Sequence, residues 1–124
     1  MKNLSLPDAY DLTLKMLHSV RRLHLNNYMH LDIKPHNFRF SVFSRVLTLL
    51  DFGFAQSTLV REEINCGTHL FKSPETEHTG FSTVKSDVYS LGITLGCLFS
   101  AFDYEQVAAR YNKNPKAFTE KKVV

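Results

Sequence analysis

Four side chains in the middle of this sequence carry groups that phosphoryl transfer needs. Asp32, Lys34 and Asn37 lie in one short polar stretch, and Asp51 follows further along the chain. Transfer of a phosphoryl group from a nucleotide to a hydroxyl needs cations held by oxygen ligands and a carboxylate beside the attacking hydroxyl. Asp32 can accept a proton or orient the nucleophile, and Lys34 can reach the transferring phosphate. Asn37 and Asp51 offer oxygen ligands for cations, so we expect one shared cluster.

A helix is predicted just before these residues. Ser5, Pro7 and Asp8 are typical of a helix start, because serine can accept a free backbone N–H and an acidic residue suits the positive helix end. Apolar residues then recur at helical spacing up to about Leu25, after which Asn26-Asn27 is expected to end the helix. The helix therefore delivers the chain to the polar stretch.

A small hairpin is predicted between the two acidic residues. Residues 38–40 and 46–50 are rich in aromatic and branched side chains and are separated by a polar turn. Antiparallel pairing of these runs places Asn37 and Asp51 side by side. The sequence thus predicts an α+β chain, mainly helical, with one or two short hairpins.

Five ordered motifs resemble the larger, C-terminal lobe of a eukaryotic-type protein kinase of the serine/threonine class. The family patterns H-R-D-x-x-x-x-N and D-F-G are matched at His30, Asp32 and Asn37 and at Asp51, Phe52 and Gly53. Three further marks follow in the family's order: Gly67-Thr68, Ser73-Pro74-Glu75, and the run from Ser86 through Asp87 to Gly92. Lys34 and Thr68 resemble the serine/threonine branch rather than the tyrosine branch.

The resemblance implies a role for each matched position. It makes Asp32 the catalytic base, puts Lys34 on the phosphate, and assigns Asn37 and Asp51 to Mg²⁺, with ATP as the phosphoryl donor. Thr68 is then a substrate-binding residue. The remaining matched residues are structural in the family: His30, Phe52, Gly53, Glu75 and Asp87. His30 is expected to be packed and hydrogen-bonded, and Phe52 is expected in the core.

Asp87 has two interpretations. After Lys85-Ser86 it can cap a helix whose apolar residues, from Val88 to Leu98, leave few polar faces. In the family, the matching aspartate instead binds the backbone of the catalytic loop.

Residues 51–75 show little periodicity, which fits a mobile activation segment rather than an element of the core.

Three positions depart from the family pattern. Leu31 stands where most of the family has arginine, so control through a phosphate on the activation segment is not expected. Ser73 for alanine is a mild change, and His36 for glutamate is neutral for metal binding. The arginine that usually pairs with the glutamate matching Glu75 has no counterpart here, so Glu75 is expected to be unpaired.

Length and composition set the domain organisation. The 124 residues are 44% hydrophobic and 22% charged, which suits one compact domain. Residues 1–102 are assigned to a partial kinase C-lobe and residues 103–124 to a tail of unclear structure. Neither G-x-G-x-x-G nor V-A-I-K occurs before Asp32, so the N-lobe is expected to be absent and the domain truncated.

Charge and cysteine content limit the partners and the cellular compartment to be expected. The net charge of +3 is spread along the chain rather than clustered, which argues against nucleic acid as a partner. Cys66 and Cys97 lack metal-ligand or secreted-disulfide spacing, and the apolar run at residues 91–99 is too short to span a bilayer. No signal peptide is recognised, so a cytoplasmic protein without a membrane partner is expected.

Two functions from different classes follow. The first is an ATP-dependent serine/threonine protein kinase acting on a protein substrate, weak or inactive as this isolated chain. The second is a catalytically inactive kinase-lobe mimic, a pseudokinase that binds and regulates another kinase.

Overall fold

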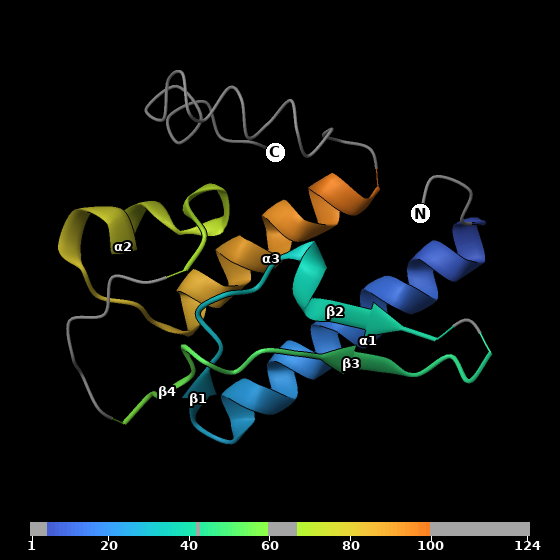
Figure 1. Ribbon diagram of the computed structural model, residues 1–124, viewed down its shortest axis with the longest axis horizontal. Coiled ribbons are helices and arrows are strands. Elements are labelled where there is room, and N and C mark those ends of the chain that lie inside the picture. Colours follow the sequence, from blue (N-terminus) through green and yellow to red (C-terminus); the bar gives the residue numbers. More distant parts are fainter. Residues whose placement is uncertain (1–4, 42, 60–66, 100–124) are drawn as a thin grey trace.

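The computed structural model describes residues 5–41, 43–59 and 67–99, and Figure 1 shows two long helices, α1 and α3, beside short antiparallel strands. This arrangement confirms the predicted mixture of helices with short strands. The elements run in the order α1 Leu6–Leu25, β1 Tyr28–Met29, the 3₁₀ turn η1 Pro35–Asn37, β2 Phe38–Phe40, β3 Leu47–Leu49, β4 Gln56–Ser57, the 3₁₀ turn η2 His69–Phe71, α2 Pro74–Thr79 and α3 Val84–Leu98.

Helix α1 begins and ends where its sequence predicts. The hydroxyl of Ser5 accepts the backbone N–H of Asp8 at 3.2 Å, and Asn26 is the C-cap residue. Leu12, Met16 and Val20, one helical turn apart, are buried. These three side chains form the core with Ile33 and Leu91. Since Ile33 follows Asp32 directly, the core anchors the polar stretch from one side.

Strands β2 and β3 form the predicted hairpin. Phe38 pairs with Leu49 and Phe40 with Leu47, and the hairpin lies against α1 (Figure 1). The hairpin was expected to use residues 46–50, and the observed strand β3 is shorter.

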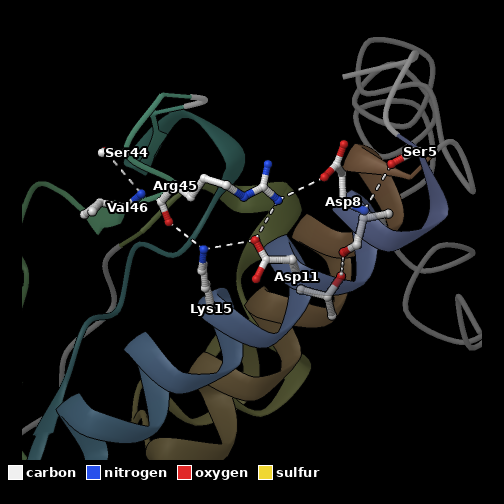
Figure 2. A network of polar contacts seen from close by, with 9 residues as sticks. Ser5, Asp8, Asp11, Lys15, Ser44, Arg45 and Val46 are labelled. Atoms are coloured by element: carbon white, nitrogen blue, oxygen red, sulfur yellow. Dashed lines mark hydrogen bonds and ion pairs between the residues drawn. The ribbon is translucent and has the colours of Figure 1, made fainter.

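A charged network fastens the turn of this hairpin to α1. Figure 2 shows Arg45 reaching from the turn to Asp8 and Asp11, with Nη2 at 2.9 Å and 2.8 Å from their carboxylates. Lys15 bonds the same Asp11 carboxylate at 2.9 Å, and both cations lie over the Phe40 ring. Arg45 has a left-handed backbone, with φ of 59°, so these contacts hold an unfavourable turn conformation.

A second, two-stranded sheet joins distant segments. Strand β1 pairs antiparallel with β4, so that Met29 lies opposite Gln56. The segment that follows Asp51 therefore lies beside the strand that leads into the polar stretch.

Part of the segment 51–75 belongs to the core, so its assignment to a mobile loop is wrong for that part. Leu70 and Phe71 of η2 are buried, with exposed fractions of 4% and 1%, because η2 packs against α3. Residues 60–66, which include Cys66, lie outside the described residues, as does the predicted tail 103–124. The domain boundary at 102 therefore stays a prediction.

Helix α3 begins three residues before Asp87. Thr83 is the N-cap: its hydroxyl accepts the N–H of Lys85 at 3.1 Å, and the Ser86 hydroxyl accepts the N–H of Thr83 at 3.0 Å. The N-cap interpretation of Asp87 is therefore wrong, because Thr83 already fills that position. None of the helices in the described ranges is long and apolar enough to cross a membrane.

Candidate active site

The loop between β1 and η1 holds Asp32, which is 7% exposed. His30, fully buried, braces it: the backbone N–H of Asp32 donates to His30 Nδ1 at 3.1 Å. The other ring nitrogen, Nε2, lies 2.8 Å from the carbonyl oxygen of Leu50. A carbonyl only accepts and an N–H only donates, so the ring proton is on Nε2 and His30 ties the loop to the end of β3.

Leu50 brings Asn37 and Asp51 together. Its carbonyl accepts from His30, and its N–H donates to the backbone carbonyl of Asn37 at 2.7 Å. Asp51 is the next residue, so its backbone is one peptide unit from Leu50, which is held by these two hydrogen bonds. Asp51 has a left-handed φ of 58°, and its Oδ1 accepts the N–H of Gly53 at 3.3 Å. The hairpin thus brings the backbones of Asn37 and Asp51 close to each other.

The side chain of Asn37 is oriented by Asp32. Its Nδ2 donates to the Asp32 carbonyl oxygen at 2.7 Å and lies 3.3 Å from Asp32 Oδ2. With the amide nitrogen turned to Asp32, the amide oxygen Oδ1 is the atom left for a ligand. Asn37 is also 7% exposed, so that oxygen is held in a fixed position.

Lys34, Thr68 and Asp32 form a polar chain across two loops. Lys34 Nζ donates to Thr68 Oγ1 at 2.9 Å, and the Thr68 hydroxyl donates to Asp32 Oδ1 at 3.0 Å. Lys34 Nζ also lies 3.8 Å from Asp32 Oδ2. The predicted base, the predicted phosphate-binding lysine and the predicted substrate residue therefore lie in contact.

The residues present fit a magnesium nucleotide. Mg²⁺ in such sites takes one or two protein oxygens and completes its shell with phosphate oxygens and water. The oriented amide of Asn37 and the exposed carboxylate of Asp51 supply that kind of donor set. Within residues 5–41, 43–59 and 67–99, no group of three or more His, Cys, Asp or Glu side chains is arranged to hold a metal ion.

Asp87 of α3 supports the loop between β1 and η1. Its carboxylate is fully buried and accepts the N–H of His30 at 2.8 Å and the N–H of Leu31 at 2.9 Å. Leu31 has a left-handed φ of 69°, which is costly for a branched side chain. On its other side, the Leu31 carbonyl faces Gly67, where an added Cβ would stand 2.7 Å from that oxygen.

Two structural expectations need correction. Phe52 is 49% exposed instead of buried in the core, because it stands at the surface with its ring edge-on to His30, centroids 5.1 Å apart. Glu75 is not unpaired: Ser86 of α3 donates its hydroxyl to Glu75 Oε1 at 3.3 Å. Burial raises the pKa of Tyr89, and the nearby charge of Glu75 raises it further.

Sequence reasoning missed the contribution of His24, and it named Gly67 only as part of a family motif without a structural role. His24 Nε2 lies 2.9 Å from Asp87 Oδ2, and Gly67 allows the close approach to Leu31 described above. No role was predicted for His24. Its place in the last turn of a helix that leads directly into the loop is a signal that could have found it.

Comparison with known proteins agrees with this geometry. Residues 1–121 match the model of the protein kinase domain. The chain is 34% identical over 123 residues to a probable serine/threonine-protein kinase of Dictyostelium discoideum, covering 92% of this chain and 18% of that protein. It is 30% identical over 119 residues to the serine/threonine-protein kinase PrkC of Bacillus subtilis, covering 90% and 18%. A third relative, the serine/threonine-protein kinase MPS1 of Encephalitozoon cuniculi, is 38% identical over 99 residues, covering 74% and 17%.

The chain spans less than a fifth of the length of these relatives. The match to the domain model nevertheless covers nearly all of its 124 residues. The braced loop, the oriented amide and the domain match lead to one conclusion: this chain belongs to the protein kinase family.

Proposed function

We propose that this chain is the base-and-metal part of a serine/threonine protein kinase domain, corresponding to its C-terminal lobe. The supporting observation is the polar chain from Lys34 through Thr68 to Asp32, with Asn37 bonded to the same aspartate. The substrate is then a protein hydroxyl.

Each side chain has a part that its contacts allow. Asp32 Oδ1 accepts from Thr68, and the remaining lone pairs of the carboxylate can accept the proton of an incoming hydroxyl. Lys34 places its positive charge beside that carboxylate, where charge on the transferring group is stabilised. Asn37 and Asp51 would hold Mg²⁺ on the nucleotide. Bound Mg²⁺–ATP supplies the phosphoryl group and neutralises its charge.

Positioning carries most of the catalysis in phosphoryl transfer. In the family, the G-x-G-x-x-G loop covers the nucleotide phosphates and the lysine of V-A-I-K pairs with them. Neither motif occurs in these 124 residues, so we expect the purified chain to show at most weak phosphotransfer.

The test measures transfer from γ-labelled ATP to myelin basic protein in the presence of Mg²⁺. Asp32→Asn should abolish the weak transfer, whereas Asp8→Asn, the same chemical change in the first turn of α1, should leave it unchanged. Equal transfer by the Asp32→Asn chain would overturn the assignment of the base. Robust turnover abolished by Asp32→Ala would instead contradict the expected weakness.

A second candidate, the inactive kinase-lobe mimic, is favoured by one observation. A hollow of about 350 Å³ lies between α1 and β3, and Leu23, Leu47, Leu49 and Phe52 are among its lining residues. In this candidate function, another kinase would cover that apolar surface. Immobilised chain should then retain a kinase from cell lysate, and Phe52→Ser should release it. Recovery of no kinase would count against the mimic.

A further inference from the structure

A cluster of hydroxyl groups lies where α2 meets the start of α3. Its centre is Thr76 of α2, which is 2% exposed. Oxygen atoms of four other residues surround Thr76 Oγ1: Ser73 Oγ at 2.8 Å, the Phe81 carbonyl oxygen at 3.1 Å, Ser82 Oγ at 3.1 Å and Ser86 Oγ at 3.3 Å. One side chain of α2 therefore contacts its own N-cap residue, the linker to α3 and the first turn of α3.

The capacity of the Thr76 hydroxyl decides how the protons of this cluster are arranged. A hydroxyl has one proton to donate and two lone pairs that accept. The Phe81 carbonyl can only accept, so it takes the proton of Thr76. The lone pairs of Thr76 then accept from Ser73 and Ser82, the two nearest hydroxyls. The Thr76 hydroxyl is fully used in this way, and Ser86 gives its own proton to Glu75 Oε1 at 3.3 Å.

The cluster holds one end of residues 68–73, here called the substrate segment because it begins at Thr68. The Thr68 hydroxyl donates to Asp32 Oδ1 at 3.0 Å, and the Thr68 carbonyl accepts the N–H of Phe71 at 2.9 Å. Ser90 of α3 donates to the Phe71 carbonyl in the middle of the segment. Ser73, the last residue, is held by Thr76. A shift of Ser73 is therefore passed through one short turn to the residue that contacts the predicted base.

Glu75 has a smaller share in this attachment. In the protein kinase family, the matching glutamate usually pairs with an arginine. In this chain Glu75 is exposed, and its carboxylate accepts a hydrogen bond from the neutral hydroxyl of Ser86. Water competes for an exposed carboxylate, whereas a hydrogen bond in the low dielectric of the interior is stronger. The buried Thr76 hydroxyl is therefore the stronger link between the two helices.

We propose that Thr76 is a positioning residue: its hydroxyl, rather than the charge of Glu75, anchors the substrate segment to α3. Its relevance to catalysis rests on the proposed function of Thr68 and Asp32. The attachment itself does not, so it can be tested without any phosphotransfer assay.

The test compares two substitutions of Thr76 by amide hydrogen exchange and NMR on the full chain. Thr76→Val keeps the branched shape and removes the hydroxyl, whereas Thr76→Ser keeps the hydroxyl. A neutral hydrogen bond changes an equilibrium constant by roughly two- to twelvefold, so losing the bonds to Ser73, Phe81 and Ser82 should speed local exchange about tenfold or more. We expect this acceleration in Thr76→Val at the Glu77 N–H, which donates to the Ser73 carbonyl at 3.2 Å, together with a displaced Thr68 amide signal. Thr76→Ser should restore most of the protection.

Two matched variants separate the hydroxyl from the charge and from threonine substitution in general. Glu75→Gln keeps an acceptor oxygen and removes the charge, so it should accelerate exchange of the Glu77 N–H by less than about twofold. Thr48→Val makes the same chemical change at an exposed position of β3 and should leave this amide unchanged. If Thr76→Val did not fold, Ser82→Ala would remove a single hydrogen bond of the cluster and should still accelerate exchange of the Glu77 N–H about twofold or more.

Several results would overturn the proposal. One is an acceleration in Glu75→Gln as large as that in Thr76→Val. Others are equal losses in the Val and Ser variants, acceleration spread evenly over α1 and α3, or unchanged exchange in Ser82→Ala. If the phosphotransfer test failed while these amides behaved as expected, only the proposed function would be lost.

Discussion

Gly67→Ala should destabilise the chain far more than its size suggests. Gly67 has a φ of 101°, which L side chains rarely adopt, and the new Cβ would stand 2.7 Å from the carbonyl oxygen of Leu31. A backbone of this kind costs roughly 1–3 kcal/mol for a residue with a side chain. The overlap is with backbone, so relief requires a shift of the loop, at a further cost of about 1–3 kcal/mol.

The free energy of unfolding should therefore fall by roughly 2–6 kcal/mol. For a chain of this length, that corresponds to a drop in Tm of about 10 °C or more. Urea unfolding followed by circular dichroism measures the loss, and the Leu31 amide shift reports the displacement of the loop.

Gly92→Ala is the matched control. Gly92 lies in α3, and an added Cβ there meets no atom within 4 Å. The same substitution should be neutral or stabilise the chain by up to about 1 kcal/mol, the helix propensity difference. If the two variants unfolded at the same urea concentration, the close approach of Gly67 to the loop would be refuted.

Three further outcomes are expected. Asp87→Asn should lower the free energy of unfolding by about 3–5 kcal/mol, measured by urea titration, because an amide cannot replace the buried charge on the loop N–H groups. Hydrogen bonds from Lys15 and Arg45 hold the pKa of Asp11 below 3.8, so their stabilisation is present above pH 3.8 and is lost as pH falls through the lower folded value; Arg45→Ala should raise that pKa in an NMR titration. Met16→Ala, at a fully buried position, should cost about 2–5 kcal/mol in thermal unfolding.

Elements with local signals could be predicted from the sequence. Helix α1 has a serine cap, a regular apolar spacing and an asparagine at its end, and all three lie within the helix or directly beside it in the sequence. The β2–β3 hairpin likewise joins neighbouring runs, so the juxtaposition of Asn37 and Asp51 needed only a short turn.

Contacts between distant segments could not be predicted in this way. The attachment of Asp87 to His24 and the approach of Gly67 to Leu31 join residues far apart in the chain, and no local pattern encodes them. The burial of Phe71 could not be predicted for the same reason, because it depends on the packing of η2 against α3, which is distant in the chain. The N-cap role considered for Asp87 was a reasonable interpretation of the local sequence, but Thr83 is the N-cap residue.

The most direct test asks whether a divalent cation binds between Asn37 and Asp51. Mn²⁺ with ATP can replace Mg²⁺, and its paramagnetism broadens nearby NMR signals. We expect broadening of the Asn37 side-chain amide and the Gly53 N–H, lost in Asp51→Asn and kept in Asp8→Asn. Broadening that persisted in Asp51→Asn, or that centred on Asp8 and Asp11 instead, would contradict this expectation.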